Sequence, residues 1–322
     1  MNSVFDKRRL GNTDLEVSPI GLGVMQFAGG SGMFGMMFPE ISQEEKNLIV
    51  SSAIEGGISW FDTAEMYGRG NSERGLRDAL VHVGINDEDV IIGTKWFPMF
   101  RTARNIPRTI EDRLRYLSGF TIDLYMVHQP WGFSSPESEM DAMADLVADG
   151  KIRSIGVSNF NVNQMQRAQA ALEKRGLPLA VNQVQYSLIH RNIESNGLLE
   201  AAKSMKVTIV AWSPLGSGIL SGNFHKNPEL LDRTPVGRRF RLRRQVDRTA
   251  PLIETQQEIA EKHDVTLAQV ALNWLLNAHG DTVVAIPGAS KVTQAEQNAG
   301  AMNFRLTDEE MARLDTVSKE IL

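Results

Sequence analysis

Polar residues end short apolar runs at a regular interval along this chain. Asp62, Lys95 and His128 each stand where a run rich in β-branched and aromatic residues stops. Their spacing of roughly 30 residues is typical of successive strands in βα units. Because the carboxyl ends of parallel strands meet at one edge of a sheet, we expect the three side chains to converge there.

Eight short apolar segments have the length and composition of strands, and helical periodicity separates each from the next. These segments are 20–23, 58–62, 90–95, 122–127, 152–157, 180–185, 207–212 and 282–286. Eight strands that alternate with helices predict an α/β fold, the (β/α)8 TIM barrel. Residues 7–18 are predicted to form a β-hairpin ahead of the barrel, and residues 1–322 to form a single domain. Capping-box sequences at Ser42, Thr266 and Thr307 predict three helix starts.

Two segments are too long for ordinary βα connections and are predicted to be long loops at the C-terminal face. Loop 25–41 is rich in glycine and methionine, which predicts a lining for an apolar substrate pocket, a hydrophobic plug or a subunit contact. Segment 214–250 is predicted to connect the seventh strand with the next helix. Its Arg-rich part, 233–248, predicts either a flap over a bound dinucleotide or a solvated surface. The arginines are Arg233, Arg238, Arg239, Arg241, Arg243, Arg244 and Arg248.

Composition excludes several classes of protein. The chain has 322 residues, 42% hydrophobic and 23% charged, which is enough for a large core. It has no cysteine, which excludes disulfides, thiolate metal sites and a cysteine nucleophile. A formal net charge of -5 predicts no nucleic-acid binding. No signal-like apolar core begins the chain, and no apolar run reaches the ~20 residues of a membrane span, so we expect a cytoplasmic protein with no membrane partner.

An aspartate, a tyrosine, a lysine and a histidine at the mouth of a parallel barrel suit carbonyl reduction, in which tyrosine gives a proton and a nicotinamide gives a hydride. Tyr67 is the candidate acid, and Lys95 is the cation that would stabilise its phenolate. Asp62 would keep Lys95 charged. His128 would either orient the substrate carbonyl or assist proton delivery. Each residue alone is more commonly a turn or surface residue, so the prediction rests on their joint occurrence.

The sequence also resembles the aldo-keto reductase family, in particular its bacterial branch related to potassium-channel β subunits. The resemblance extends from Arg9 to Asn298 and includes segments 60–68, 91–95, 122–128 and 156–159. It implies that Asp62, Tyr67, Lys95 and His128 are the catalytic tetrad, with Tyr67 as general acid.

The resemblance further implies a nicotinamide cofactor across the barrel mouth, since no G-x-G-x-x-G follows the first strand. Ser158, Asn159 and Gln183 would hold its carboxamide. Trp212 would stack on the nicotinamide ring, and the alternative is a core tryptophan. A loop at 213–218 would cover the pyrophosphate, and the alternative is a generic turn. The other implied cofactor residues are Gly23, Met25, Ser213, Leu215, Gly216, Ser217, Gly218, Ile286, Gly288, Ser290, Lys291, Gln294, Gln297 and Asn298.

The adenosine 2′-phosphate would lie at the start of the helix that follows strand 282–286. Lys291 offers a cation there, but Gln294 occupies a position where many relatives carry an arginine. The resemblance therefore implies NADP (NADPH), with NAD as the alternative.

These observations predict an NAD(P)H-dependent oxidoreductase that reduces small-molecule aldehydes or ketones to alcohols and needs no metal. By position, Phe27, Trp96, Trp131 and loop 30–38 are predicted to bound an apolar substrate pocket. A different class of function is a cofactor-sensing regulatory subunit with the same fold and little turnover, as in the potassium-channel β subunits. A metal-dependent barrel hydrolase would need clustered histidine and carboxylate ligands, which the sequence does not suggest. Neither the physiological substrate nor the oligomeric state follows from the sequence.

Overall fold

The computed structural model describes residues 3–30, 39–233 and 236–322, and in these ranges eight parallel strands pair in chain order. They are β3 (Leu22–Gly23), β4 (Trp60–Asp62), β5 (Ile91–Trp96), β6 (Leu124–Val127), β7 (Ser154–Ser158), β8 (Leu179–Gln185), β9 (Thr208–Trp212) and β10 (Val283–Ile286). Bridges from Ile20 to Ala285 and from Gly23 to Gly288 join the first strand to the last. The predicted (β/α)8 barrel is confirmed.

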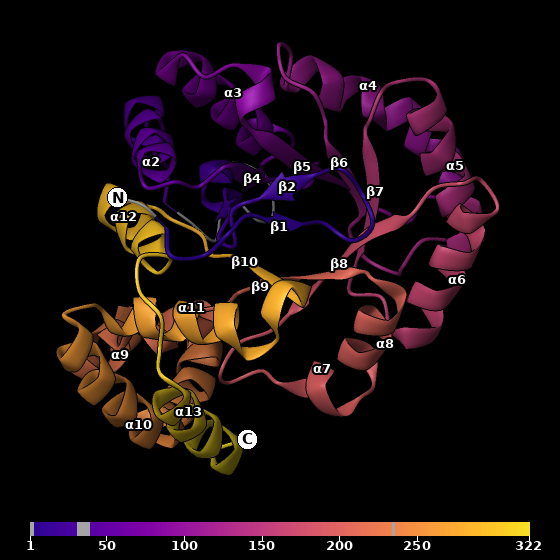
Figure 1. Cartoon of the computed structure of the whole chain (residues 1–322). Helices are drawn as coiled ribbons and strands as arrows, with labels where there is room; N and C mark the ends of the chain where they lie inside the picture. Colours follow the sequence, from indigo (N-terminus) through magenta and orange to yellow (C-terminus); the bar gives the residue numbers. More distant parts are fainter. Residues whose placement is uncertain (1–2, 31–38, 234–235) are drawn as a thin grey trace.

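Helices surround the strands on the outside of the barrel (Figure 1). The helices are α2 (Gln43–Glu55), α3 (Asn71–Val83), α4 (Ile106–Tyr116), α5 (Pro136–Ala148), α6 (Val162–Glu173), α7 (Asn192–Ser195), α8 (Leu198–Met205), α9 (Asn223–Lys226), α10 (Val236–His263), α11 (Leu267–Ala278), α12 (Val292–Gly300) and α13 (Asp308–Glu320). Short 3-10 turns are η1 (Met25–Ala28), η2 (Asp87–Asp89), η3 (Ala103–Asn105), η4 (Gly216–Ser221), η5 (Pro228–Arg233) and η6 (Gly280–Thr282).

Successive residues of each strand point alternately into and out of the barrel. The inward side chains pack with residues of the N-terminal hairpin, which consists of β1 (Arg8–Arg9) and β2 (Glu16–Val17). The amide of Gly11 donates to Thr208 Oγ1 at the start of β9, so the hairpin closes the N-terminal end of the barrel. Members of this interior cluster include Leu10, Leu15, Val17, Trp60, Leu124, Met126, Val181, Val210 and Val284.

The same alternation directs polar side chains to the other end of the barrel. Asp62 lies two residues after the inward Trp60, and Lys95 lies four residues after Ile91, which packs against the same interior cluster. Both side chains therefore point inward at the C-terminal ends of neighbouring strands, where the sequence predicts the site.

The segment 214–250 differs from the prediction. It is not one long loop, because η4, α9 and η5 occupy its first half and α10 begins at Val236. Along α10 the side chains of Leu242 and Val246 are buried, whereas those of Arg243, Arg244 and Arg248 are exposed. The arginines thus line the solvent face of an amphipathic helix, and arginine is a good helix former. The side chains of Arg233, Arg238 and Arg241 lie outside what the structure describes.

The methionine-rich segment is only partly within the described ranges. Its first residues, Met25–Ala28, form η1. Residues 31–38 lie outside the described residues, so the three alternatives for this loop stay predictions.

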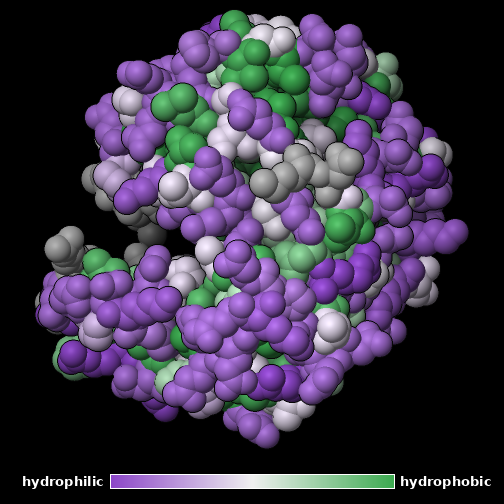
Figure 2. All heavy atoms as spheres, turned by 60° about the vertical axis from the view of Figure 1, so that its left-hand side comes forward, coloured by the Kyte–Doolittle hydropathy of each residue, from purple (hydrophilic) through white to green (hydrophobic). Residues whose placement is uncertain are grey.

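The outer surface carries polar side chains over much of the face shown in Figure 2, and apolar side chains form separate patches on it. Within the described ranges, no helix combines the length and the apolar character that crossing a membrane requires.

Candidate active site

A buried ion pair lies at the centre of the site. The ammonium Nζ of Lys95 donates to Asp62 Oδ1 at 2.5 Å and to the carbonyl oxygen of Thr63 at 2.8 Å. Lys95 is fully buried and Asp62 is 2% exposed. Burial lowers the pKa of Lys95, and the Asp62 carboxylate opposes this shift because it favours the charged ammonium. The pairing predicted for Asp62 and Lys95 is therefore present.

A chain of hydrogen bonds connects this pair to the candidate cofactor residues. Gln183 Nε2 donates to Asp62 Oδ2 at 2.9 Å, and Ser158 Oγ donates to the Gln183 carbonyl at 2.9 Å. Asn159 Nδ2 donates to Ser158 Oγ at 3.0 Å, and its Oδ1 accepts from Trp212 Nε1 at 3.1 Å. The structure thus places Gln183 against the ion pair and links Ser158, Asn159 and Trp212 to it through successive hydrogen bonds. The bond from Gln183 to Asp62 is an interaction that sequence reasoning missed.

Tyr67 and His128 lie against each other beside the ion pair. Their rings meet edge to face with centroids 5.6 Å apart, and Lys95 Nζ lies 5.3 Å from the Tyr67 ring centroid. The Tyr67 hydroxyl and the His128 Nε2 make no hydrogen bond to any described residue, and His128 Nδ1 is buried without a partner among them. Burial, together with the charge of Lys95, holds the pKa of His128 well below its usual range, so this ring is neutral near neutral pH.

The pKa of Tyr67 departs from the sequence prediction. We expected the Lys95 cation to stabilise the phenolate, but burial and then the Asp62 carboxylate raise the pKa of Tyr67. The physical reason is that a buried phenolate loses its hydration and faces a carboxylate as well as an ammonium. In this chain Tyr67 therefore keeps its proton throughout the neutral range.

The loop that follows β9 has a strongly bent backbone. Ser213, Gly216, Ser217 and Gly218 all have positive φ angles between 53° and 93°. A Cβ on Gly216 would lie 2.4 Å from the side chain of Ile189, so packing and φ both require glycine there. The amides of residues 216–218 donate within the loop, to Ser213 and Leu215. A phosphate would therefore meet the exposed Ser217 side chain rather than these three amides.

The residues after β10 form a second polar group. Asn298 Nδ2 donates to the Gly288 carbonyl at 3.3 Å, and the amide of Ser290 donates to Gln294 Oε1 at 2.7 Å. Lys291 is the N-terminal cap residue of α12, and its side chain is exposed. Gln294 therefore caps the preceding turn with its own side chain.

The remaining predicted cofactor residues lie around the same mouth. The amide of Gly23 donates to the Pro287 carbonyl, and a Cβ on Gly288 would lie 2.3 Å from the Gln26 side chain. Met25 packs against the small cluster that contains Tyr67. The side chains of Ile286 and Leu215 belong to or pack against the cores of the barrel, and Gln297 is half-buried on α12.

The predicted substrate pocket needs correction. Trp96 and Phe27 are fully buried in the core between strands and helices, so neither lines an open pocket. Trp96 follows Lys95 directly and therefore points out of the barrel. Trp131 is 55% exposed, and residues 31–38 of the predicted loop lie outside the described residues. Sequence reasoning missed Phe97, which has the parity of Lys95 and whose ring centroid lies 6.0 Å from that of His128.

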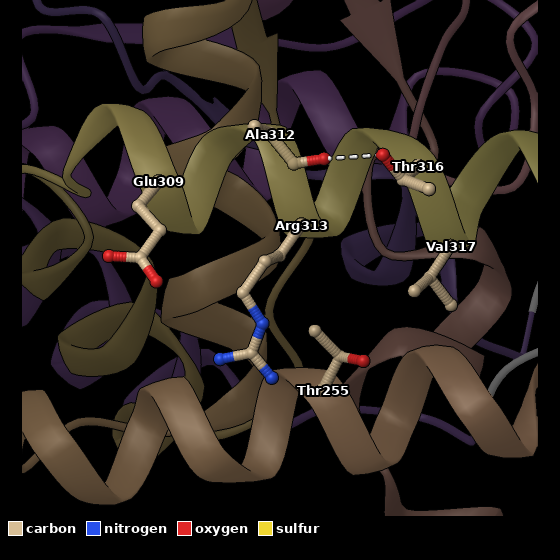
Figure 3. A pocket seen from close by; sticks show the side chains of 6 residues that line it. All are labelled: Thr255, Glu309, Ala312, Arg313, Thr316 and Val317. Atoms are coloured by element: carbon tan, nitrogen blue, oxygen red, sulfur yellow. Dashed lines mark hydrogen bonds between the residues drawn. The ribbon is translucent and has the colours of Figure 1, made fainter.

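A groove with a volume of about 360 Å³ lies elsewhere, between α10 and α13 (Figure 3). Thr255 comes from α10, and Glu309, Ala312, Arg313, Thr316 and Val317 come from α13. None of the candidate catalytic or cofactor residues contributes to it. The groove therefore belongs to the outer helices and not to the barrel mouth.

The family model for the aldo/keto reductase family matches residues 19–319. The chain belongs to this family. An uncharacterized oxidoreductase of Mycobacterium tuberculosis is 36% identical over 296 residues, which are 91% of this chain and 86% of that protein. This member of the family thus has relatives that are named oxidoreductases.

Solved structures of family members match the whole barrel. A thermostable aldo-keto reductase in complex with the inhibitor epalrestat has a TM-score of 0.78 and 32% sequence identity, covering 97% of this chain and 100% of that one. An aldo/keto reductase from Klebsiella pneumoniae in complex with NADP and acetate has a TM-score of 0.72 and 26% identity, covering 97% of this chain and 95% of that one.

Proposed function

We propose that the chain is an NADPH-dependent reductase that converts aldehydes or ketones to alcohols, with Asp62, Tyr67, Lys95 and His128 as its catalytic residues. The observation that carries this proposal is the buried Lys95–Asp62 pair directly beside Tyr67 and His128 at the C-terminal end of the barrel. Membership of the aldo/keto reductase family supports it.

Tyr67 would be the proton donor. Its hydroxyl is free of hydrogen bonds to described residues, so it can bond a substrate carbonyl oxygen. Its raised pKa keeps the proton on the phenol until negative charge develops on that oxygen. The ammonium of Lys95, 5.3 Å from the ring centroid, would then stabilise the phenolate that remains.

His128 would orient the substrate carbonyl. Because its pKa is well below the usual range, it acts as a neutral hydrogen-bonding group and not as a cation. The edge-to-face contact between the Tyr67 and His128 rings supports this role, because two polar groups on adjacent rings could both reach one substrate oxygen.

The polar residues of the mouth fit a nicotinamide cofactor. Gln183 uses its NH2 group on Asp62 and keeps its amide oxygen as an acceptor, while Ser158 and Asn159 lie next to it. The Trp212 ring is held in place by Asn159 and is only partly buried, so one face can cover a flat ring. When bound across these residues, reduced nicotinamide would supply the hydride.

We infer a preference for NADP over NAD from Lys291. This cation stands at the start of α12, where backbone N–H groups and the helix dipole favour an anion. NADP is also the cofactor in the similar Klebsiella pneumoniae structure. Gln294 provides no positive charge, which leaves Lys291 as the cation that distinguishes the two cofactors at this turn.

A substrate screen tests the proposed function. The protein would be mixed with NADPH and a panel of aliphatic and aromatic aldehydes and ketones, and the loss of NADPH absorbance would be followed. We expect steady consumption, proportional to the protein concentration, with one or more of these carbonyl classes. Tight NADPH binding without turnover across the whole panel would contradict the proposal and would indicate a cofactor-sensing subunit.

A further inference from the structure

Two carboxylates flank Tyr67: Glu65 lies in the segment between β4 and α3, and Glu73 lies in the first turn of α3. Glu65 lies two residues before the tyrosine, and its carboxylate accepts from the Phe97 amide at 3.0 Å and from Arg101 at 2.6 Å. The amide of Glu65 also donates to the Lys95 carbonyl at 3.2 Å. These hydrogen bonds hold the first half of the segment against the end of β5.

Glu73 connects the other end of this segment, the start of α3, to β5. Its side chain is fully buried on α3, where Oε1 accepts from Thr94 Oγ1 at 2.7 Å. Thr94 immediately precedes Lys95 and points to the opposite side of β5. At the end of β5, the outward side chain of Thr94 therefore bonds to Glu73, and the inward side chain of Lys95 bonds to Asp62.

Arg113 of α4 links the two carboxylates. Its Nε donates to Glu73 Oε2 at 2.7 Å, and one terminal nitrogen lies 3.5 Å from Glu65 Oε1. The Arg113 side chain is 4% exposed, and the side chains of Glu65 and Glu73 are 13% and 0% exposed. With Arg101, the group contains two positive and two negative charges, so no charge in it is left unbalanced.

We propose that Arg113 is a positioning residue for the reduction, because it ties together both ends of the segment that carries Tyr67 and holds them against the strand that carries Lys95. This role depends on the proposed function. An arginine suits this task because its planar fork can serve two acceptors at once, which a lysine ammonium on a flexible stem does less well. Without it, the Tyr67 hydroxyl would no longer be held at a fixed distance from the ammonium.

Two variants test this role. Arg113→Lys keeps the charge and removes the fork, and Glu73→Gln with Arg113→Met removes the whole buried pair without leaving a lone charge. The measurements are the single-turnover rate of NADPH oxidation with the best aldehyde of the screen, the KM of that aldehyde, the pH profile of the rate, the Kd of NADPH and the melting temperature. In both variants we expect a rate about 10- to 100-fold lower, since small misplacements of reacting groups have effects of this size. KM and the Kd of NADPH should change less than about threefold, because the Arg113 side chain is buried against Glu65 and Glu73 and is not one of the candidate binding residues.

A matched control is the ion pair between Asp123 and Arg153 at the opposite end of β6. Asp123 is buried, accepts from the Ile92 amide and pairs with Arg153 at 2.7 Å. The double variant Asp123→Asn with Arg153→Met removes an ion pair whose carboxylate is buried and whose arginine is exposed. Its single-turnover rate should stay within about twofold of the wild type.

The outcomes separate this inference from the proposed function. A wild-type protein that oxidises no NADPH with any carbonyl contradicts the proposed function. Two outcomes with an active wild type overturn only the positioning role. In one, the Arg113 variants have the same single-turnover rate as the wild type. In the other, the control variant is slowed as much as they are. Loss of folding in both Arg113 variants would show that the pair serves stability, and this too would overturn the role.

Discussion

Lys95 is an ammonium in a place where water cannot reach it. An unpaired buried ammonium tends to lose its proton, and here Asp62 and the Thr63 carbonyl both accept hydrogen bonds from it. Asp62 in turn accepts from Gln183, so each carboxylate oxygen has a donor. This arrangement favours a charged lysine 5.3 Å from the centroid of the Tyr67 ring, where it would stabilise a phenolate.

If Lys95 acts through Tyr67, the effects of changing the two residues should not add. We expect Lys95→Met to reduce kcat about as much as Tyr67→Phe, roughly 10²- to 10⁴-fold, and the double variant to lose little more. The measurement is a double-mutant cycle on kcat with one aldehyde at neutral pH. Independent losses that multiply in the double variant would show that the lysine has a separate task.

The side chain of Lys291 should distinguish the two dinucleotides. We expect Lys291→Ala to raise the Kd of NADPH about tenfold, or about 1.4 kcal/mol, which is near the lower end for a charged hydrogen bond because the side chain is exposed. The Kd of NADH should hardly change. Titrations of both cofactors by tryptophan fluorescence measure this, and equal changes for NADH and NADPH would contradict a contact with the 2′-phosphate.

Gln294→Arg supplies the cation that many relatives have, although it also removes the cap on Ser290. We expect it to tighten NADPH selectively, and more so at low ionic strength. Thr293→Arg is the matched control because it adds the same charge at the neighbouring exposed position. A comparable gain in NADPH affinity in the control would mean that general electrostatic attraction is responsible, and not a guanidinium at position 294 that bonds the 2′-phosphate.

Much of the candidate site could be predicted at this scale. The period of two along a strand and the regular spacing of strands are enough to place Asp62, Lys95 and His128 at one end of a barrel. The bond between Gln183 and Asp62 could not be predicted, because it joins residues on strands that are not neighbours in the sheet. The raised pKa of Tyr67 also escaped prediction, since it depends on how deeply the ring is buried.

At the scale of elements, α5 contains a buried carboxyl group, that of Glu139, with no hydrogen-bond partner in the part of the chain that the structure describes. Glu139 is 2% exposed, and its Oε1 has no hydrogen bond within the described residues. A Cβ on Gly132 would lie 2.4 Å from that oxygen, so the carboxyl group sits directly beneath the loop after β6. Burial raises the pKa of Glu139 to about 8 from its ordinary value of 4.5.

This pKa makes the stability of the protein depend on pH. Between pH 4.5 and 8 the folded chain holds a proton on Glu139 that the unfolded chain releases, so folding stability decreases as the pH rises through this range. The decrease is at most about 1.4 kcal/mol per pH unit. In Glu139→Gln this dependence is absent, and we expect its melting temperature to rise relative to that of the wild type from pH 5 to pH 8.

Glu137→Gln on the same helix is the control for this measurement. The Glu137 side chain is 39% exposed and paired with Arg167, whose hydrogen bond holds the pKa of that carboxyl group at about 2. Its ionisation is nearly complete above pH 5, so the control should shift the melting temperature about equally from pH 5 to pH 8. A Glu139→Gln variant that behaves like the control would show that Glu139 is ionised in the folded protein.

Helix starts were predicted well where a capping side chain determines them. The capping boxes at Thr266 and Thr307 are formed, and at Ser42 the side chain accepts the Glu45 amide. The prediction of a long loop was wrong for 214–250, which contains η4, α9, η5 and the start of α10, a helix with Pro251 in its interior. Proline removes only one helical hydrogen bond, and burial of Leu242, Val246 and Leu252 on one side of α10 stabilises the helix despite it.

At the scale of the whole molecule, the N-terminal end of the barrel is closed by the hairpin, and the C-terminal end contains the candidate active site. The hairpin fills the N-terminal end with Leu10, Leu15 and Val17, and Arg8 donates to backbone carbonyls of α11 and β10. The C-terminal end carries the ion pair, Tyr67 and His128. This division follows from the parallel strands, whose carboxyl ends all lie on one side.

The central claim is that this end of the barrel reduces carbonyl compounds with a proton from Tyr67. The most direct test compares wild type and Tyr67→Phe, which lacks only the phenolic hydroxyl, in kcat for one aldehyde at neutral pH and in the Kd of NADPH. We predict a fall in kcat of about 10²- to 10⁴-fold with a Kd changed less than about threefold. A variant that keeps more than about half of the wild-type kcat would contradict the claim.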